Sequence, residues 1–307
     1  MAGIGIHHVT AIAGKARGNR AFYAGVLGLR LIKRTVNFDD PGAFHLYYGD
    51  AEASPGSVIT FFPWEHAAPG QLGTGEVQEI ALRAPPAAMG FWQSRLAPHG
   101  AVEHTRFGET VLRLRDPDGL RLAVVPCPGV EREPAWQAEG IPPAFALRGL
   151  HGVSLLLADA APTAAILSDV LGFATLGREG DTVRMRAVGA RDSQVVDIEV
   201  SGQARAWRLG RGSVHHLAFR ALDDAGQAAV AARLAEWHGI QASPQRDRAY
   251  FRSIYFREPG NVLFEVATDT PGFTVDEPLA ALGQALQLPP FLEDQRDAIL
   301  QRLPPLD

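Results

Sequence analysis

The stretch GIHHVTAIAG, residues 5–14, carries two adjacent histidines at the start of a segment rich in apolar and β-branched residues. This composition, ended by a glycine, predicts a strand. A second pair of adjacent histidines stands in VHHLAFRA, residues 214–221, which has a similar pattern. A histidine in a strand is usually an ordinary core or surface residue, so the two pairs indicate chemistry only if the rest of the chain supports it.

The chain contains an internal repeat, which shows which positions are structurally equivalent. Four pairs of stretches correspond: GIHHVTAIA (5–13) with GLHGVSLLL (149–157) and ValLeuGly 26–28 with 170–172, both at an offset of 144; VQEIALRA (77–84) with VHHLAFRA (214–221) at 137; and DPDGLRLAV (116–124) with EPGNVLFEV (258–266) at 142. The sequence therefore predicts two fused copies of a half that is itself a duplication.

Each quarter of the chain has the same predicted order: a strand, a helix and three short strands separated by turn residues. In the first quarter we expect a strand at 4–13, a helix at 17–28 and strands at 30–37, 44–49 and 57–63. In the fourth quarter we expect a strand at 212–221, a helix at 223–238 and strands at 240–245, 250–257 and 261–268. The expected fold class is α+β, built from four βαβββ modules.

The module boundaries divide the chain into four segments. Two modules occupy residues 1–126 and two occupy 148–268, and the segment between them, 127–147, begins with the proline-rich run CPGVEREPAWQAEGIPP. Such a composition is typical of a linker. Residues 269–307 are expected to form a helical tail that packs over the core. A half-curled sheet cannot close by itself, so the modules are expected to pair.

The composition excludes several classes of protein. A chain of 307 residues with 46% hydrophobic and 21% charged residues is typical of a globular protein of two domains. Its net charge of −5, without a basic stripe, argues against nucleic acid as a partner. A single cysteine, Cys127, allows no internal disulfide. No apolar run approaches about 18 residues and no signal peptide is evident, so a cytoplasmic protein without a membrane partner is expected.

Strand alternation sorts the histidines by face. His8 is expected to share a face with Thr10, while His7 faces the other way, and His216 and His215 are expected to differ in the same manner. The carboxylate of Glu265 interrupts the apolar strand VLFEVAT, 262–268. A buried charge must be paired, protonated or bound to a metal, because an unpaired one costs several kcal/mol.

The repeat gives an independent test of these positions. His8 corresponds to Gly152, Glu265 to Ala123 and His216 to Glu79. At two of the three positions the scaffold accepts a small neutral residue, so the fold does not require His8 or Glu265. Two imidazoles and a carboxylate form the facial triad that suits non-haem Fe(II) and leaves positions open for other molecules. The alternative is that the three are ordinary strand residues, since ligands so dispersed in sequence are a weak signal.

The chain resembles the hydroquinone-type ring-cleaving dioxygenases of the vicinal oxygen chelate superfamily, which includes glyoxalases, bleomycin resistance proteins and extradiol dioxygenases. Five stretches and a short tail motif carry the resemblance: IHHVTAIAG (6–14), FYAGVLGLRLIKRTVNFDDPGAFHLYYGD (22–50), PGSVITFFPW (55–64), SVHHLAFR (213–220), DRAYFRSIYFREPGNVLFEVATD (247–269) and LeuProPro (288–290). It implies a vicinal oxygen chelate fold, two tandem domains with curled mixed sheets around a metal cup, and Fe(II) held by His8, His216 and Glu265.

The same resemblance implies catalytic or supporting roles for His7, Thr10, His215, Arg248 and Tyr255. His215 and Tyr255 are the candidates for proton transfer and hydrogen bonding, and Arg248 for stabilising negative charge. Each also has an ordinary alternative. Arg248 could be a solvated arginine, Tyr255 a core aromatic and Thr10 a β-branched strand residue, while His7 and His215 could merely orient the ligand histidines or stabilise the strand.

The predicted reaction inserts O2 into a small dihydroxylated aromatic, with a hydroquinone favoured by the resemblance. Mn or Zn could substitute for iron, because similar ligands bind several divalent metals. One competing function is a glyoxalase-like isomerase or lyase, although such sites generally use four protein ligands and Ala123 and Gly152 offer none. Another is a non-catalytic binding protein that confers resistance. Related proteins often form dimers or tetramers, so a homo-oligomer is compatible with the sequence.

Overall fold

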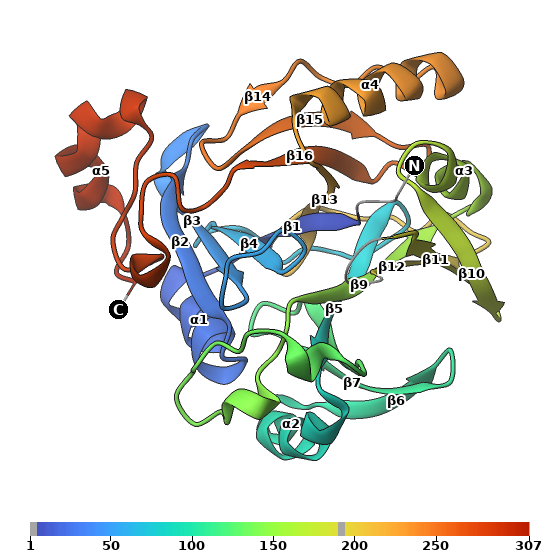
Figure 1. Ribbon diagram of the computed structural model, residues 1–307, viewed down its shortest axis with the longest axis horizontal. Helices are drawn as coiled ribbons and strands as arrows, with labels where there is room; N and C mark the ends of the chain where they lie inside the picture. The colour runs from blue at the N-terminus through green and yellow to red at the C-terminus, as the bar shows by residue number, and fades with distance from the viewer. Residues whose placement is uncertain (1–4, 190–193, 307) are drawn as a thin grey trace.

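A computed structural model describes residues 5–189 and 194–306 of the chain. Four βαβββ modules follow one another, and they build two curled eight-stranded sheets (Figure 1). The prediction of an α+β vicinal oxygen chelate fold with four modules is confirmed. The domain boundaries at residues 126 and 148 stay a prediction.

Each module begins with a strand and a helix and ends with three strands. The first has β1 (Ile6–Ala13), α1 (Ala16–Arg20) continued by the π-helix η1 (Ala21–Val26), β2 (Arg30–Asn37), β3 (Asp40–Gly49) and β4 (Val58–Pro63). The second has β5 (Glu76–Ala84), α2 (Met89–Leu96), β6 (Val102–Arg106), β7 (Glu109–Arg115) and β8 (Arg121–Pro126). The third has β9 (Leu150–Leu157), α3 (Ala161–Asp169), β10 (Phe173–Glu179), β11 (Thr182–Ala187) and β12 (Val195–Val200). The fourth has β13 (Val214–Ala221), α4 (Asp224–His238), β14 (Arg246–Asp247), β15 (Phe251–Arg257) and β16 (Leu263–Pro271).

The modules pair in the order first with fourth and second with third. One sheet has the strand order β14-β15-β16-β13-β1-β4-β3-β2, and the other has β10-β11-β12-β9-β5-β8-β7-β6. Each sheet therefore combines strands from both halves of the chain. The central contact of the first sheet is the antiparallel pair of β1 and β13, which are the two strands that carry the adjacent histidines.

A β-bulge interrupts the first strand of every module. In the β1–β13 pair the register shifts between Ile6 and His8 and again opposite His215, so the extra residues are His7 and His215. In the β5–β9 pair the extra residues are Gln78 and His151, which occupy the equivalent positions of the repeat. A bulge turns its side chain away from strict alternation. The expectation that His7 and His215 face away from their neighbours is therefore wrong, for a reason that the alternation rule omits.

The last module shows how local signals set its elements. Asp223 caps α4 by accepting a hydrogen bond from the backbone N–H of Gly226, and Gly239 ends the helix in the left-handed region at φ 67°. The strand expected at 240–245 is absent, and only the short β14 forms, at Arg246–Asp247. Pro244 lies in the expected segment and has no N–H to donate to a ladder.

The C-terminal segment packs on the outer side of the first module. It contains the short helices η6 (Leu279–Ala281), η7 (Pro290–Gln295) and α5 (Arg296–Arg302), with α5 beside β2 and β3 in Figure 1. Leu286, Leu292 and Ile299 are buried in the main hydrophobic core. Within the described residues, no helix combines the length and the apolar character needed to cross a membrane.

Candidate metal centre

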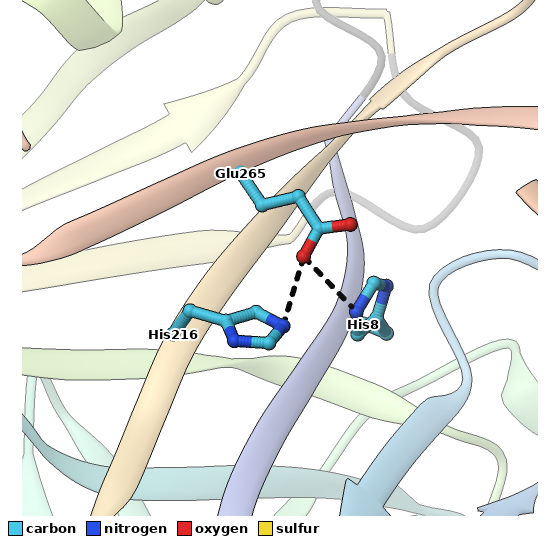
Figure 2. A group of neighbouring side chains, drawn as sticks. All are labelled: His8, His216 and Glu265. Carbon is cyan, nitrogen blue, oxygen red and sulfur yellow. Dashed lines mark ion pairs between the residues drawn. The ribbon is translucent and has the colours of Figure 1, made fainter. Parts of the chain in front are cut away.

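Three side chains from three neighbouring strands converge at the bottom of the first sheet's cup. His8 lies on β1, His216 on β13 and Glu265 on β16, and a ligand atom of each lies within 4.8 Å of the others (Figure 2). The Glu265 Oε2 atom is 2.8 Å from Nε2 of His216 and 3.6 Å from Nε2 of His8. All three residues are buried. The structure thus brings together the three residues expected to bind a metal.

The two oxygens of Glu265 have different surroundings. Oε1 accepts a hydrogen bond from the Ser253 hydroxyl on β15. Oε2, which faces the two histidines, is buried without a hydrogen-bond partner among the described residues. An orphaned carboxylate oxygen beside two imidazole nitrogens is costly unless a cation completes the group. The donor set fits a divalent metal ion of the type that accepts nitrogen and oxygen ligands.

The second histidine of each pair contacts the first. The Nδ1 atoms of His7 and His8 are 2.8 Å apart, and those of His215 and His216 are 2.7 Å apart. A histidine that binds a metal through Nε2 carries its proton on Nδ1, so as metal ligands His8 and His216 would donate these hydrogen bonds and the bulge histidines would accept them. The bulges thus place a hydrogen-bond partner beside the ring of each candidate ligand.

Burial keeps the imidazoles of the centre neutral. It lowers the pKa of His7 to about 4, and it lowers the pKa of His215 and of His216 to about 3. Burial also lowers the pKa of His8 well below its usual value, although Glu265 opposes that shift. Neutral imidazole is the form that binds metals. The four imidazoles around Glu265 are therefore in the form that can bind a metal or accept a hydrogen bond.

A cavity of about 380 Å³ leads from the surface to the three candidate ligands. Aromatic side chains line much of it, and Phe62 and Trp64 are stacked with their ring centroids 5.9 Å apart and an interplanar angle of 12°. Phe251 also lines it and lies 4.9 Å from the His8 ring. Such a mostly apolar cleft with a few polar groups suits a small organic molecule with a flat ring.

The other expected site residues lie around this cavity, with one exception. Thr10, His215, Arg248 and Tyr255 line it, whereas His7 lies behind His8 and is not among its lining residues. Arg248 is half-buried, and its Nε donates a hydrogen bond of 3.3 Å to the Tyr255 hydroxyl.

Arg248 also spans the two paired modules. Its terminal nitrogen lies 3.2 Å from the carboxylate of the exposed Asp39, in the turn between β2 and β3. The pKa of the Tyr255 hydroxyl is raised by burial, so the phenol keeps its proton near neutral pH. Tyr255 is thus a protonated donor at the cavity wall, held against a guanidinium.

Hydrogen bonds connect polar residues in and next to the cavity wall, and the sequence did not point to three of them, His45, Tyr47 and Thr60. The Thr60 hydroxyl lies 2.9 Å from that of Thr10 and 2.7 Å from Nε2 of His45. The other ring nitrogen of His45 lies 2.9 Å from the Tyr47 hydroxyl. His45 and Tyr47 line the cavity. The stretch FHLYYG, 44–49, contains both, but nothing in the tandem repeat marks them.

The equivalent positions of the second sheet do not form a centre. Ala123 offers no ligand, and a side chain at Gly152 would meet the backbone oxygen of Val195 at 2.1 Å. Glu79 is the remaining member, and it is held by Arg106 and Arg113. Ala123 and Gly152 lie in the second sheet, whereas Glu265 lies in the first, so the expectation that they are the two empty ligand positions of this centre is wrong.

Two pairs of βαβββ modules, each pair sharing a curled sheet, define a vicinal oxygen chelate protein. The profile of the Glyoxalase/Bleomycin resistance protein/Dioxygenase superfamily matches residues 5–124. The chain is 44% identical to MhqO of Bacillus subtilis, provisionally described as a ring-cleaving dioxygenase, over 99% of this chain and 97% of that protein. It is 31% identical to the chlorohydroquinone/hydroquinone 1,2-dioxygenase of Sphingobium indicum, over 97% and 95%. The chain belongs to this superfamily.

Solved structures agree with this assignment. A crystal structure of a Bacillus subtilis protein, provisionally described as a dioxygenase, matches with a TM-score of 0.93 and 42% identity over 100% of this chain and 98% of that one. Glyoxalase I from Zea mays matches with a TM-score of 0.62 over 86% and 92% of the chains. At 13% identity the latter shows a shared fold and nothing about the reaction.

Proposed function

We propose that this protein is an Fe(II)-dependent ring-cleaving dioxygenase that acts on a small dihydroxylated aromatic, with a substituted hydroquinone as the favoured substrate. The observation that carries the proposal is the open arrangement of His8, His216 and Glu265 at the end of an aromatic cavity, with Glu265 Oε2 left without a hydrogen bond. The described functions of the full-length relatives support the reaction class, and the relative at 31% identity supports the hydroquinone.

His8, His216 and Glu265 would hold the iron. Two neutral imidazoles and one carboxylate leave an Fe(II) centre with a formal charge of about +1, which favours an anionic ligand such as a phenolate. When bound, the iron would supply a redox-active centre with open coordination positions for the aromatic diol and O2. Both oxygen atoms enter the ring-opened product, so the diol itself supplies the electrons and no further reductant is needed.

Arg248 and Tyr255 form the polar wall of the reaction chamber. Arg248 donates to the Tyr255 oxygen, and Tyr255 lines the cavity. We assign Tyr255 to donate a hydrogen bond to a substrate oxygen and Arg248 to stabilise negative charge that develops there. Asp39 holds the guanidinium at the mouth of the cavity, so it positions the charge.

The two bulge histidines have different assignments because only one reaches the cavity. His215 would accept a hydrogen bond from Nδ1 of His216, and it lines the cavity, so we assign its Nε2 to exchange a proton with the substrate. His7 is buried behind His8, so we assign it to position that ring. Thr10 is held by Thr60, which fits a positioning role at the cavity wall.

The test is anaerobic purification, reconstitution with Fe(II), and oxygen uptake on addition of a panel of hydroquinones and catechols. We expect uptake with a ring-opened product, lost in Glu265→Ala. A panel without uptake, on protein that binds one metal ion per chain, would move the assignment to an isomerase or lyase. Protein that binds no metal would instead favour the non-catalytic binding protein.

A further inference from the structure

The two strands at the centre of the first sheet are related by a local two-fold axis. In the β1–β13 pair, His8 lies opposite Ala218 and Thr10 lies opposite His216. Exchanging the two strands therefore superposes His8 on His216 and Thr10 on Ala218. The two ligand histidines are symmetry partners, and so are the bulges that precede them.

The neighbouring strands obey the same symmetry. On one side β13 pairs with β16, and Ala218 lies beside Glu265. On the other side β1 pairs with β4, and Thr10 lies beside Thr60. Both pairs of strands are parallel. Thr60 therefore occupies the position that is related by the axis to the carboxylate ligand, and it is a short neutral side chain.

The relation extends to the next strand outward. Tyr255 on β15 pairs with Glu265, and Tyr47 on β3 pairs with Thr60. The residue two positions before each tyrosine contacts the residue that pairs with that tyrosine. The Ser253 hydroxyl donates to Glu265, and His45 Nε2 lies 2.7 Å from the Thr60 hydroxyl. His45 is thus the counterpart of Ser253.

The sizes of the side chains are exchanged between the two halves. The half that carries the carboxylate has the long Glu265 with the small Ala218 and Ser253 around it. In the other half, Thr60 takes the place of Glu265, Thr10 that of Ala218 and His45 that of Ser253. Thr60 is shorter than its counterpart Glu265, whereas Thr10 and His45 are each larger than their counterparts Ala218 and Ser253. Hydrogen bonds join Thr60 to both Thr10 and His45. Protein interiors are filled closely, so space given to one side chain is taken from its neighbours.

We propose that Thr60, packed between Thr10 and His45, limits the centre to three protein ligands. This inference rests on the proposed metal centre. A carboxylate at position 60 would give a centre of two histidines and two carboxylates, whereas threonine keeps that side of the ion for small-molecule ligands. The imidazole of His45 fills the volume that a longer side chain at position 60 would need.

The test restores the symmetry. The triple variant Thr10→Ala/His45→Ser/Thr60→Glu copies the residues of the liganded half, and the same triple variant with Thr60→Gln is its matched control. Dissociation constants for Co(II) are measured by competition with a chelator on metal-free protein. We expect the variant with glutamate to bind Co(II) at least about tenfold more tightly than the variant with glutamine. Thermal unfolding of the metal-free proteins checks that both are folded.

A second measurement asks whether a carboxylate at position 60 can replace the one removed at position 265. Glu265→Ala should weaken Co(II) binding by about 100-fold or more, and adding the triple substitution to Glu265→Ala should recover at least about tenfold. If the triple variant does not fold, His45→Ser/Thr60→Glu, which keeps Thr10, is compared with His45→Ser/Thr60→Gln under the same criteria.

The outcomes separate the two proposals. Folded variants with glutamate that bind Co(II) no more tightly than those with glutamine would overturn the role of Thr60, while leaving the three-ligand centre intact. Wild-type protein that binds no Co(II), or a Glu265→Ala variant that binds as tightly as wild type, would overturn the metal centre and this inference with it.

Discussion

His7 and His8 are neighbours in one strand, yet their Nδ1 atoms lie 2.8 Å apart. In a regular strand the two rings would point to opposite faces of the sheet. The bulge at His7 removes that separation, and the matching bulge at His215 does the same for His216. In the proposed centre, each pair of adjacent histidines consists of a metal ligand and its hydrogen-bond partner, and the same type of β-bulge brings the two rings together in both strands.

The partner role of His7 gives the first prediction. His7→Phe keeps a ring of similar shape but removes the nitrogen that accepts the His8 proton. Outer hydrogen-bond partners of metal ligands are typically worth about 10–100-fold in metal affinity, so we expect a loss in that range in Co(II) titrations of metal-free protein. His151→Phe changes the equivalent bulge of the second sheet and should leave the affinity unchanged. Equal losses in both variants would indicate a general structural effect.

Ser253 provides a graded test of the carboxylate. Ser253→Ala removes the hydrogen bond that holds Glu265 Oε1, while Oε2 remains directed at the two histidines. We expect Ser253→Ala to lower Co(II) affinity by about 10–100-fold, less than the loss in Glu265→Ala, because the first removes a support and the second removes a ligand. Isothermal titration calorimetry on metal-free protein measures both. A Ser253→Ala loss as large as that of Glu265→Ala would contradict this order.

Tyr255 should matter for turnover and not for metal retention. Tyr255→Phe removes the hydroxyl that faces the cavity but leaves the ring against His216, whose centroid is 5.9 Å away. A positioned hydrogen-bond or proton donor contributes about 10²–10⁴-fold, so kcat should fall within that range at unchanged metal content. Tyr48→Phe is the control, since its buried hydroxyl has no hydrogen-bond partner among the described residues and lies outside the cavity lining. Wild-type turnover in Tyr255→Phe would reject the role.

Glu76, at the start of β5 in the second sheet, should make the stability of the protein depend on pH. Burial raises its pKa from 4.5 to about 7, and Oε1 has no hydrogen-bond partner in the described part of the chain. Because the folded pKa is the higher one, stability contributed by the neutral form is complete below pH 4.5 and is lost as the pH rises through about 7.

Glu76→Gln keeps the neutral group at every pH. Relative to wild type, the variant should therefore gain about 1–2 kcal/mol of unfolding free energy between pH 5 and pH 8, measured by urea denaturation. Glu52→Gln, a change at an exposed carboxylate, should show no such trend. A Glu76→Gln difference that is constant with pH would show that Glu76 does not titrate in this interval.

The fold was predictable from the sequence because its internal repeats and its hydrophobic alternation can both be recognised without knowing which strands pair. The three candidate ligands were found because a lone carboxylate in an apolar strand is costly, and the repeat shows glycine and alanine where the fold needs no His8 or Glu265. The orientation of His7 was not predictable by alternation, since a bulge depends on the register between strands far apart in sequence.

His45 and Thr60 were missed for a different reason. The tandem repeat aligns the first module with the third, whereas in space the first module pairs with the fourth. Comparing HLYY, 45–48, with SIYF, 253–256, would have revealed the equivalence of Tyr47 and Tyr255. That comparison becomes meaningful only once the pairing of the modules is known.

The pairing of the first module with the last has a consequence for how the protein is made. β1 and β4 leave the ribosome early, but β13 and β16, which carry His216 and Glu265, follow after Val214. At about 5–20 residues per second, roughly 10–40 s separate the synthesis of β4 from that of β16. Throughout that interval the nascent chain contains His8 without its partners, and the edge of β1 waits unpaired. The proposed centre can therefore be assembled only after β16 has been synthesised.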